Sequence, residues 1–271
     1  MTVYIKKFDP STIKPDGIFL FVGKRGTGKS TLIRDIMFRI KGYIDLPCAM
    51  TPTEESATMF ESCMPKSCVH DEFSVDTLRN TIEHQRRLSR RKQPQQHLLI
   101  VLDDMMFDKR VLKSMEMRDV FMNGRHLKIT FINAMQYVMD MGPDLRSQVD
   151  YVFALRENIL NNLTKLHKYF FGMFKTFQDF DKTFKSLTEN NCCIVIDNTV
   201  KSNKIEDTVF WYKADISLPP YKLGRRRYWD MDSRFYCTED EIEEKIKARC
   251  DGVQGRISNV EMTEIEHDGN E

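Results

Sequence analysis

The sequence predicts an α/β fold in which a mostly parallel central sheet carries helices on both faces. Short, mostly apolar runs such as 18–22 and 129–134 recur along the chain, as expected of strands that are buried on both faces of a parallel sheet. Segments with apolar residues at helical spacing, such as 31–40, lie between these runs. The alternation covers most of the chain and is the pattern of an α/β fold.

In the first third of the chain, glycines and capping residues mark the elements. Strand 18–22 lies between Gly17 and Gly23, and a glycine-rich loop separates it from helix 31–40. A weaker strand is expected at 45–50, and the polar residues at 52–55 indicate a helix start. Ser74 and Asp76 are candidate N-caps of the next helix, which leads into a basic cluster at 86–92.

The rest of the chain continues the alternation up to a proline-rich break. A helical stretch to about Met122 follows the apolar strand 97–102, and a phenylalanine-rich helical region follows residue 155. Further strands are expected at 129–134, 151–155, 193–196 and 209–212. Leu218-Pro219-Pro220 then interrupts the pattern, so we predict one domain at residues 1–217 and a peripheral C-terminal tail at 218–271.

The composition is that of a globular chain. Of the 271 residues, 41% are hydrophobic and 30% are charged, which argues against global disorder. We expect no membrane span and no signal peptide, and we expect the seven cysteines to be reduced thiols. Because 41 Lys and Arg balance 40 Asp and Glu, any contact with nucleic acid must rely on local basic patches, at 86–92 and 225–227.

The glycine-rich loop carries the most specific motif. Residues 23–30 read Gly-Lys-Arg-Gly-Thr-Gly-Lys-Ser and match G-x-x-x-x-G-K-[ST] between a buried strand and a helix. Such a loop turns its N–H groups around phosphate oxygens, and the following helix points its positive end at the same anion. Lys29 would reach the β- and γ-phosphates, and the Ser30 hydroxyl would ligate Mg²⁺. The predicted nucleotide-binding residues are Gly23, Lys24, Arg25, Gly26, Thr27, Gly28, Lys29, Ser30 and Thr31.

Polar residues at the ends of two other strands complete a candidate catalytic set with Lys29. Asp103 follows strand 97–102 and would hold Mg²⁺. Asp104 beside it could polarise an attacking water, which a hydrolase needs. Gln136 follows strand 129–134, where its amide could contact the γ-phosphate or that water.

Two arginines are candidates for stabilising the charge that develops in phosphoryl transfer. Arg125 lies just before strand 129–134, and Arg146 lies in the segment 142–147 after a Gly-Pro turn. The sequence leaves open which of them acts, and whether it acts in its own subunit or in a neighbour.

This ordered set of motifs resembles the DNA-packaging ATPases of nucleocytoplasmic large DNA viruses, a branch of the HerA/FtsK-type P-loop ATPases. The resemblance extends from about residue 15 to residue 215. The segments that carry it are 23–30, 103–104, 123–126, the strand that ends at Gln136, 145–150, 196–198 and 210–214.

The resemblance implies a P-loop NTPase fold of the additional-strand type, in which the strand bearing Gln136 lies between the P-loop strand and the Asp103 strand. It implies ATP and Mg²⁺ as substrate and cofactor, and a homo-oligomeric ring in which an arginine of one subunit completes its neighbour's site. The implied partners are double-stranded DNA, bound without reading its sequence, and viral proteins of the capsid or portal type. The implied location is the host cell cytoplasm, at the viral factory, with the virion as a second place.

Two other functions stay open on the sequence alone. A nucleoside or nucleotide kinase could use the arginines at 86–91 on an acceptor phosphate; it would be monomeric or dimeric, and a small nucleotide would raise its ATP turnover. A non-catalytic nucleotide-binding scaffold would bind ATP and hydrolyse it negligibly.

Overall fold

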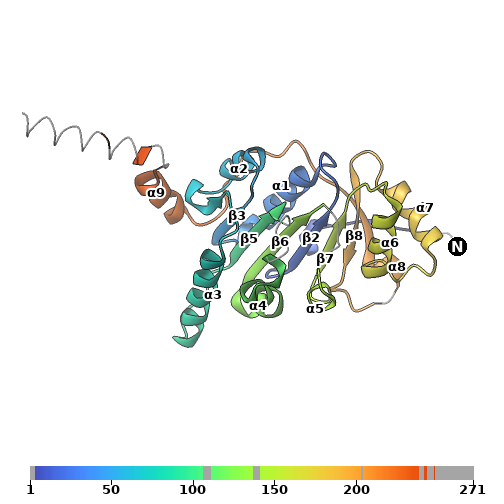
Figure 1. Cartoon of the computed structure of the whole chain (residues 1–271), viewed down its shortest axis with the longest axis horizontal. Coiled ribbons are helices and arrows are strands. Elements are labelled where there is room, and N and C mark those ends of the chain that lie inside the picture. Colours follow the sequence, from blue (N-terminus) through green and yellow to red (C-terminus); the bar gives the residue numbers. More distant parts are fainter. Residues whose placement is uncertain are drawn as a thin grey trace, which may run out of the picture. The chain divides into compact units, whose positions relative to one another are not determined.

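A single nine-stranded sheet forms the centre of the structure, a computed structural model that describes residues 4–105, 111–136, 141–202, 204–237, 241–242 and 247 (Figure 1). The strand order across the sheet is β1-β9-β8-β7-β2-β6-β5-β3-β4. The strands are β1 (Lys6–Lys7), β2 (Ile18–Val22), β3 (Leu46–Met50), β4 (Val69–His70), β5 (Leu98–Asp103), β6 (Ile129–Met135), β7 (Tyr151–Ala154), β8 (Cys192–Asp197) and β9 (Val209–Lys213).

The strand that leads into the glycine-rich loop lies in the middle of this sheet. β2 pairs in parallel with β6 on one side and with β7 on the other. β6 also pairs in parallel with β5, so β6 lies between the loop strand and the strand that ends at Asp103. Only β8 runs against its neighbours β7 and β9 in the described sheet. The predicted additional-strand arrangement and mostly parallel sheet are therefore confirmed.

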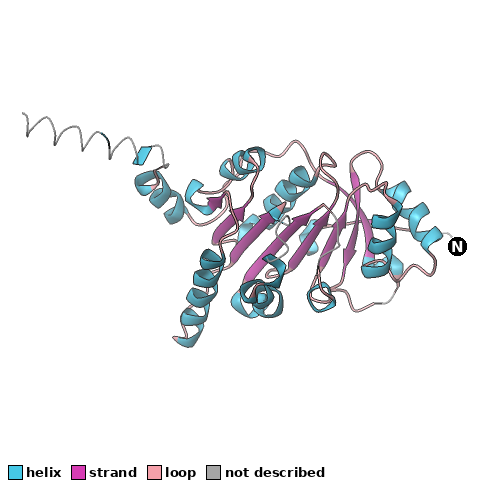
Figure 2. Ribbon diagram, viewed as in Figure 1, coloured by secondary structure: helices cyan, strands magenta, loops and turns pink. Residues whose placement is uncertain are grey.

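Helices cover both faces of the sheet (Figure 2). The helices of the described chain are α1 (Lys29–Ile40), α2 (Glu54–Glu61), α3 (Val75–Arg90), α4 (Met115–Asn123), α5 (Pro143–Arg146), α6 (Leu160–Tyr169), α7 (Phe177–Leu187), α8 (Ile205–Thr208) and α9 (Arg226–Phe235). Buried side chains of α1 and α2 pack on one face, and those of α3, α4, α5, α6 and α7 pack on the other.

Alternation along each strand supplies both cores. Phe19 and Phe21 of β2 face the core beneath α1, whereas Ile18, Leu20 and Val22 face the core beneath α4 and α6. Side chains of a strand point alternately to the two faces, so a wholly apolar run is what a strand covered on both faces requires.

Most predicted elements are present with small shifts of their ends. β2 has the predicted bounds, and α3 begins with Ser74 as its N-cap, whose side chain accepts a hydrogen bond from the Thr77 N–H. The edge strands β1 and β4, of two residues each, were not predicted, because a two-residue strand has no readable periodicity. Part of the predicted helical stretch to Met122, residues 106–110, lies outside the described residues.

The chain divides into two compact units, Met1–Asp230 and Met231–Glu271. The first unit extends past residue 217, where we predicted the domain to end, because Tyr221 and Leu223 are buried in the core on the α1 face. The Leu223 N–H donates to the Cys63 carbonyl, and Arg225 forms an ion pair with Asp45. In the second unit, residues 238–240, 243–246 and 248–271 of the predicted tail lie outside the described residues.

Two expectations from composition can be compared with the described part of the chain. None of its helices combines the length and the apolar character that a bilayer crossing requires. Its six cysteines form no disulfide.

Candidate functional site

The loop between β2 and α1 has a backbone that its glycines make possible. Gly28, the N-cap of α1, has φ of 94°, in the left-handed region that favours glycine. A Cβ atom on Gly23 would lie 2.7 Å from Thr27 Oγ1 and 2.9 Å from Leu155 Cβ, so close packing excludes a side chain there. No side chain of the cap residue covers the first turn of α1, whose N–H groups lack partners within the helix and can bind an anion.

Lys29 folds back over this loop. Its Nζ donates to the carbonyl oxygens of Gly23 at 2.6 Å and Lys24 at 3.1 Å, and the residue is only 7% exposed. Burial lowers the pKa of Lys29, while the nearby carboxylates of Asp104 and Asp103 oppose that shift. The ammonium group therefore lies between the loop carbonyls and an acidic pair.

Asp103 is the last residue of β5 and is almost fully buried. Ser56 on α2 donates its hydroxyl to Asp103 Oδ2 at 2.7 Å. Burial raises the pKa of Asp103, and the hydrogen bond from Ser56 and the charge of Lys29 act in the opposite direction. One oxygen of the Asp103 carboxylate thus accepts a hydrogen bond from Ser56. This carboxylate lies at the same edge of the sheet as the glycine-rich loop.

Asp104 and Gln136 contact each other beside Asp103. Asp104 lies just beyond β5, and its N–H donates to the Ala134 carbonyl of β6. Gln136 follows β6 and donates its Nε2 to Asp104 Oδ2 at 2.8 Å. The parallel pairing of β5 with β6 brings these two strand ends together.

A pocket of about 480 Å³ lies between the loop, the acidic pair and the start of α2. Its lining residues are Arg25, Gly26, Gly28, Lys29, Ser30, Thr31, Thr53, Glu54, Glu55, Ser56, Asp103 and Asp104. The contribution of α2 was missed in the sequence. Its signal was the polar segment at 52–56, which follows strand β3 at the same edge of the sheet and was interpreted only as a helix start.

Two other loop residues make contacts that hold the loop itself. The Thr27 hydroxyl donates to the Lys24 carbonyl at 2.7 Å. Lys24 Nζ lies 2.9 Å from Glu157, a nearly buried carboxylate that also accepts the backbone N–H groups of Asn158 and Ile159. Glu157 was not predicted, and no local pattern in the sequence marks it.

Neither candidate arginine lines this pocket. Arg125 lies in the 3₁₀ turn before β6 and forms an ion pair with Asp150, whose other oxygen accepts the N–H of Ile18 at 2.9 Å. Ile18 begins β2 and the loop follows its far end, so Arg125 is about 16 Å away, the length of a five-residue strand. Arg125 therefore lies outside the pocket of its own chain.

Arg146 also lies outside the pocket of its own chain. It is the last residue of α5, just before the amino end of β7. Its guanidinium group donates to the Met141 carbonyl and lies over the Tyr169 ring, 4.0 Å from the ring centroid. Of the predicted site residues, the structure therefore brings together the loop, Asp103, Asp104 and Gln136, and leaves both arginines apart.

The fold and the position of the loop define the class of protein. A glycine-rich loop at the carboxyl end of a central parallel strand, with an additional strand before the Asp103 strand, is a P-loop NTPase fold of the additional-strand type. No family model matches the chain.

The chain belongs to a family of proteins from large DNA viruses. It is 31% identical over 246 residues to the uncharacterized protein L437 of Acanthamoeba polyphaga mimivirus, a match that covers 87% of this chain and 85% of L437. It is 32% identical over 241 residues to the uncharacterized protein 088R of Invertebrate iridescent virus 3, covering 84% of this chain and 92% of 088R.

Solved structures share the fold. The genome packaging NTPase B204 from Sulfolobus turreted icosahedral virus 2 aligns with a TM-score of 0.53 and 17% identity, over 76% of this chain and 100% of that chain. The DNA-packaging ATPase B204 from Sulfolobus Turreted Icosahedral Virus aligns with a TM-score of 0.52 and 18% identity, over 75% and 100%. At this identity the likeness is one of fold.

Proposed function

We propose that this protein is an ATPase that uses ATP hydrolysis to move double-stranded viral DNA into a capsid. The observation that carries the ATPase part is the pocket, in which a P-loop faces the carboxylates of Asp103 and Asp104. The DNA-packaging part is supported by the shared fold with B204, a genome packaging NTPase with solved complexes of AMP and AMPPCP.

The chain's own residues fit MgATP. Lys29 and the N–H groups of the loop would hold the β- and γ-phosphates, and the Ser30 hydroxyl and Asp103 would hold Mg²⁺. Hydroxyl and carboxylate oxygens are the donors this hard cation prefers, and Ser56 engages only one Asp103 oxygen, which leaves the other for the metal. When bound, Mg²⁺ neutralises charge on the phosphates.

Asp104 and Gln136 are the proposed water-positioning pair. Asp104 would accept the proton of the attacking water, and Gln136 would orient that water through its amide oxygen while its Nε2 holds Asp104. The contact between the two side chains keeps both groups at the same corner of the pocket.

The remaining parts of the proposal concern other molecules. We propose that the arginine that stabilises the developing charge comes from a neighbouring subunit in a homo-oligomeric ring. Neither Arg125 nor Arg146 lines the pocket of its own chain, whereas Arg25 of the loop does. DNA would be gripped through its phosphates by exposed basic residues, without reading its sequence. Capsid or portal-type proteins are the proposed viral partners, in the host cytoplasm at the viral factory and in the virion.

The test is the ATPase rate of the purified protein with and without double-stranded DNA, together with the mass of the assembly. We expect hydrolysis that DNA stimulates, an oligomeric mass, and no activity in folded Lys29→Ala protein. Stimulation by a small nucleotide acceptor in a monomer would instead indicate a kinase. Binding of ATP without turnover would indicate a scaffold.

A further inference from the structure

A second pocket adjoins the first on the opposite side of the P-loop. It has a volume of about 300 Å³. Gly26, Gly28 and Thr31 are among its lining residues. Gly26, Gly28 and Thr31 also line the first pocket, so the two cavities meet at the start of α1.

The two pockets differ in chemistry. The first brings Arg25 and Lys29 together with four carboxylates, which suits phosphates and a metal ion. The second is lined by the apolar side chains of Leu32, Leu155, Cys193, Ala214 and Ile216 together with the polar side chains of Asn191 and Lys213. No carboxylate is among the described residues that line it. A nucleoside triphosphate likewise has a charged part and an apolar part, because its phosphate chain is joined through a ribose to a flat aromatic base.

We infer that the second pocket is the subsite for the nucleotide base, and that Ile216 covers the face of that base. This inference rests on the proposed ATPase function. Ile216 is 81% exposed although it is a large apolar residue that lines the pocket. Contact with an aromatic base would remove part of that apolar surface from water, which favours binding.

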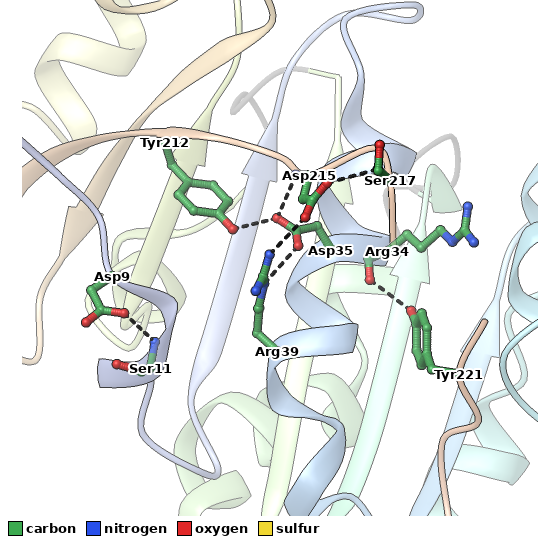
Figure 3. Close-up of polar contacts among 9 residues, drawn as sticks. All are labelled: Asp9, Ser11, Arg34, Asp35, Arg39, Tyr212, Asp215, Ser217 and Tyr221. Atoms are coloured by element: carbon green, nitrogen blue, oxygen red, sulfur yellow. Dashed lines mark hydrogen bonds and ion pairs between the residues drawn. The ribbon is translucent and has the colours of Figure 1, made fainter. Parts of the chain in front are cut away.

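The segment that carries Ile216 is tied to the P-loop helix, as Figure 3 shows. Asp35 on α1 is fully buried, and its Oδ2 accepts the Tyr212 hydroxyl at 2.5 Å and the Asp215 N–H at 3.2 Å. Asp215 in turn accepts the N–H of Ser217 at 2.9 Å. The residues on both sides of Ile216 are therefore linked to α1, whose first turn borders both pockets.

Arg39 contacts both Asp35 and Asp215 in the same network. Its Nε donates to Asp35 Oδ1 at 3.0 Å, and its guanidinium lies 3.6 Å from Asp215 (Figure 3). Asp35 is therefore a positioning residue: it touches neither pocket, and it fixes the wall of the base subsite relative to the phosphate loop. A wall held in place before binding loses less entropy when the base arrives.

The test compares two ligands that differ in the base. Dissociation constants for Mg²⁺ complexes of AMPPCP and of inorganic tripolyphosphate are measured by calorimetry for the parent, for Ile216→Ala and for Met115→Ala. Met115 is a matched control, because it is 79% exposed and lines neither pocket. We expect Ile216→Ala to weaken AMPPCP binding about 3- to 10-fold and to leave tripolyphosphate binding unchanged. Met115→Ala should bind both ligands with the affinities of the parent.

Other outcomes overturn the inference. AMPPCP affinity in Ile216→Ala equal to that of the parent, or an equal loss for both ligands, would show that Ile216 does not contact the base. A parent protein that binds tripolyphosphate as tightly as AMPPCP has no base subsite here, while its phosphate site stands. A parent that binds neither ligand contradicts the proposed ATPase function itself.

Discussion

Asp104 illustrates how a single backbone conformation shapes the candidate site. Its φ of 58° lies in the left-handed region, which aspartate tolerates better than most residues. The chain therefore turns at the end of β5, and the two consecutive carboxylates take different partners, Ser56 for Asp103 and Gln136 for Asp104. Different partners favour different roles for the two acids.

The first prediction separates metal binding from water activation. Asp104→Asn keeps the size of the side chain and removes its charge, so it should still bind MgATP and should hydrolyse about 10²–10⁴-fold more slowly, the usual contribution of a general base. Asp103→Asn should instead raise the Mg²⁺ concentration needed for half-maximal activity. Steady-state rates across a Mg²⁺ titration check both. If Asp104→Asn hydrolysed ATP at the rate of the parent, Asp104 would not activate the water, and Gln136 would be the next candidate.

The second prediction concerns the buried carboxylate of Asp35. Tyr212→Phe removes the hydroxyl that donates to Asp35 and leaves the ring in the core. A hydrogen bond to a charged group contributes about 1.5–3 kcal/mol, so the midpoint of thermal unfolding should fall by several degrees. Tyr4→Phe is the control, because Tyr4 is 80% exposed. Equal midpoints for the two variants would mean that the buried bond adds nothing to stability.

Among the elements, α3 carries a basic surface at one end. The exposed residues Arg87, Arg90, Arg91 and Lys92 lie at its C-terminal end, which projects past the sheet in Figure 1. Arg86 differs from them, since it forms an ion pair with Asp119 on α4 at 2.7 Å. Cations near the C-terminal end of a helix interact favourably with the helix dipole. This cluster therefore stabilises the helix as well as offering contacts to phosphates.

The third prediction tests α3 as the DNA contact. Replacing Arg87, Arg90 and Arg91 by Ala should reduce the DNA stimulation of the ATPase and flatten its dependence on salt, because fewer counterions are released from DNA. The rate without DNA should stay unchanged. A matched variant changes Arg226 and Arg227, which are exposed near the end of the first unit. Loss of stimulation only in that matched variant would move the DNA contact to residues 225–227.

At the scale of the whole molecule, the sheet separates the pocket from both candidate arginines. The pocket lies at the carboxyl ends of β2 and β5, whereas Arg125 and Arg146 lie before the amino ends of β6 and β7. We therefore propose that the arginine that completes the site comes from a neighbouring subunit. The ion pair of Arg125 with the buried Asp150 favours Arg146 for that role.

The fourth prediction mixes two inactive subunits. Arg146→Ala and Lys29→Ala proteins should each be inactive, and an arginine finger accounts for about 10³–10⁵ in rate. If Arg146 acts in trans, mixed rings should recover part of the ATPase activity, because some interfaces pair an intact loop with an intact arginine. No recovery at any mixing ratio, with mixed rings verified by mass, would exclude Arg146. The same experiment with Arg125→Ala then tests whether Arg125 is the arginine that acts in trans.

The predictable parts of the fold are those whose signals are local. The apolar run of β2 and the loop at 23–30 are contiguous in sequence, so burial and phosphate-binding geometry could be inferred from neighbouring residues. The position of the additional strand came from the family resemblance, since no local pattern encodes the order of strands in a sheet. The strands β1 and β4 escaped prediction because only pairing with a neighbouring strand defines them.

The sequence by itself determined the α/β class, the loop, and the three polar residues at the ends of β5 and β6. Only the tertiary structure decided which side chains meet across long separations. Ser56 and Asp103 are 47 positions apart, and Tyr212 and Asp35 are 177 apart. The same holds for the ion pair of Arg125 with Asp150, which are 25 positions apart. The physical reason is that hydrogen bonds and ion pairs depend on distance in space, which the crossover connections of the sheet set and which no local periodicity records.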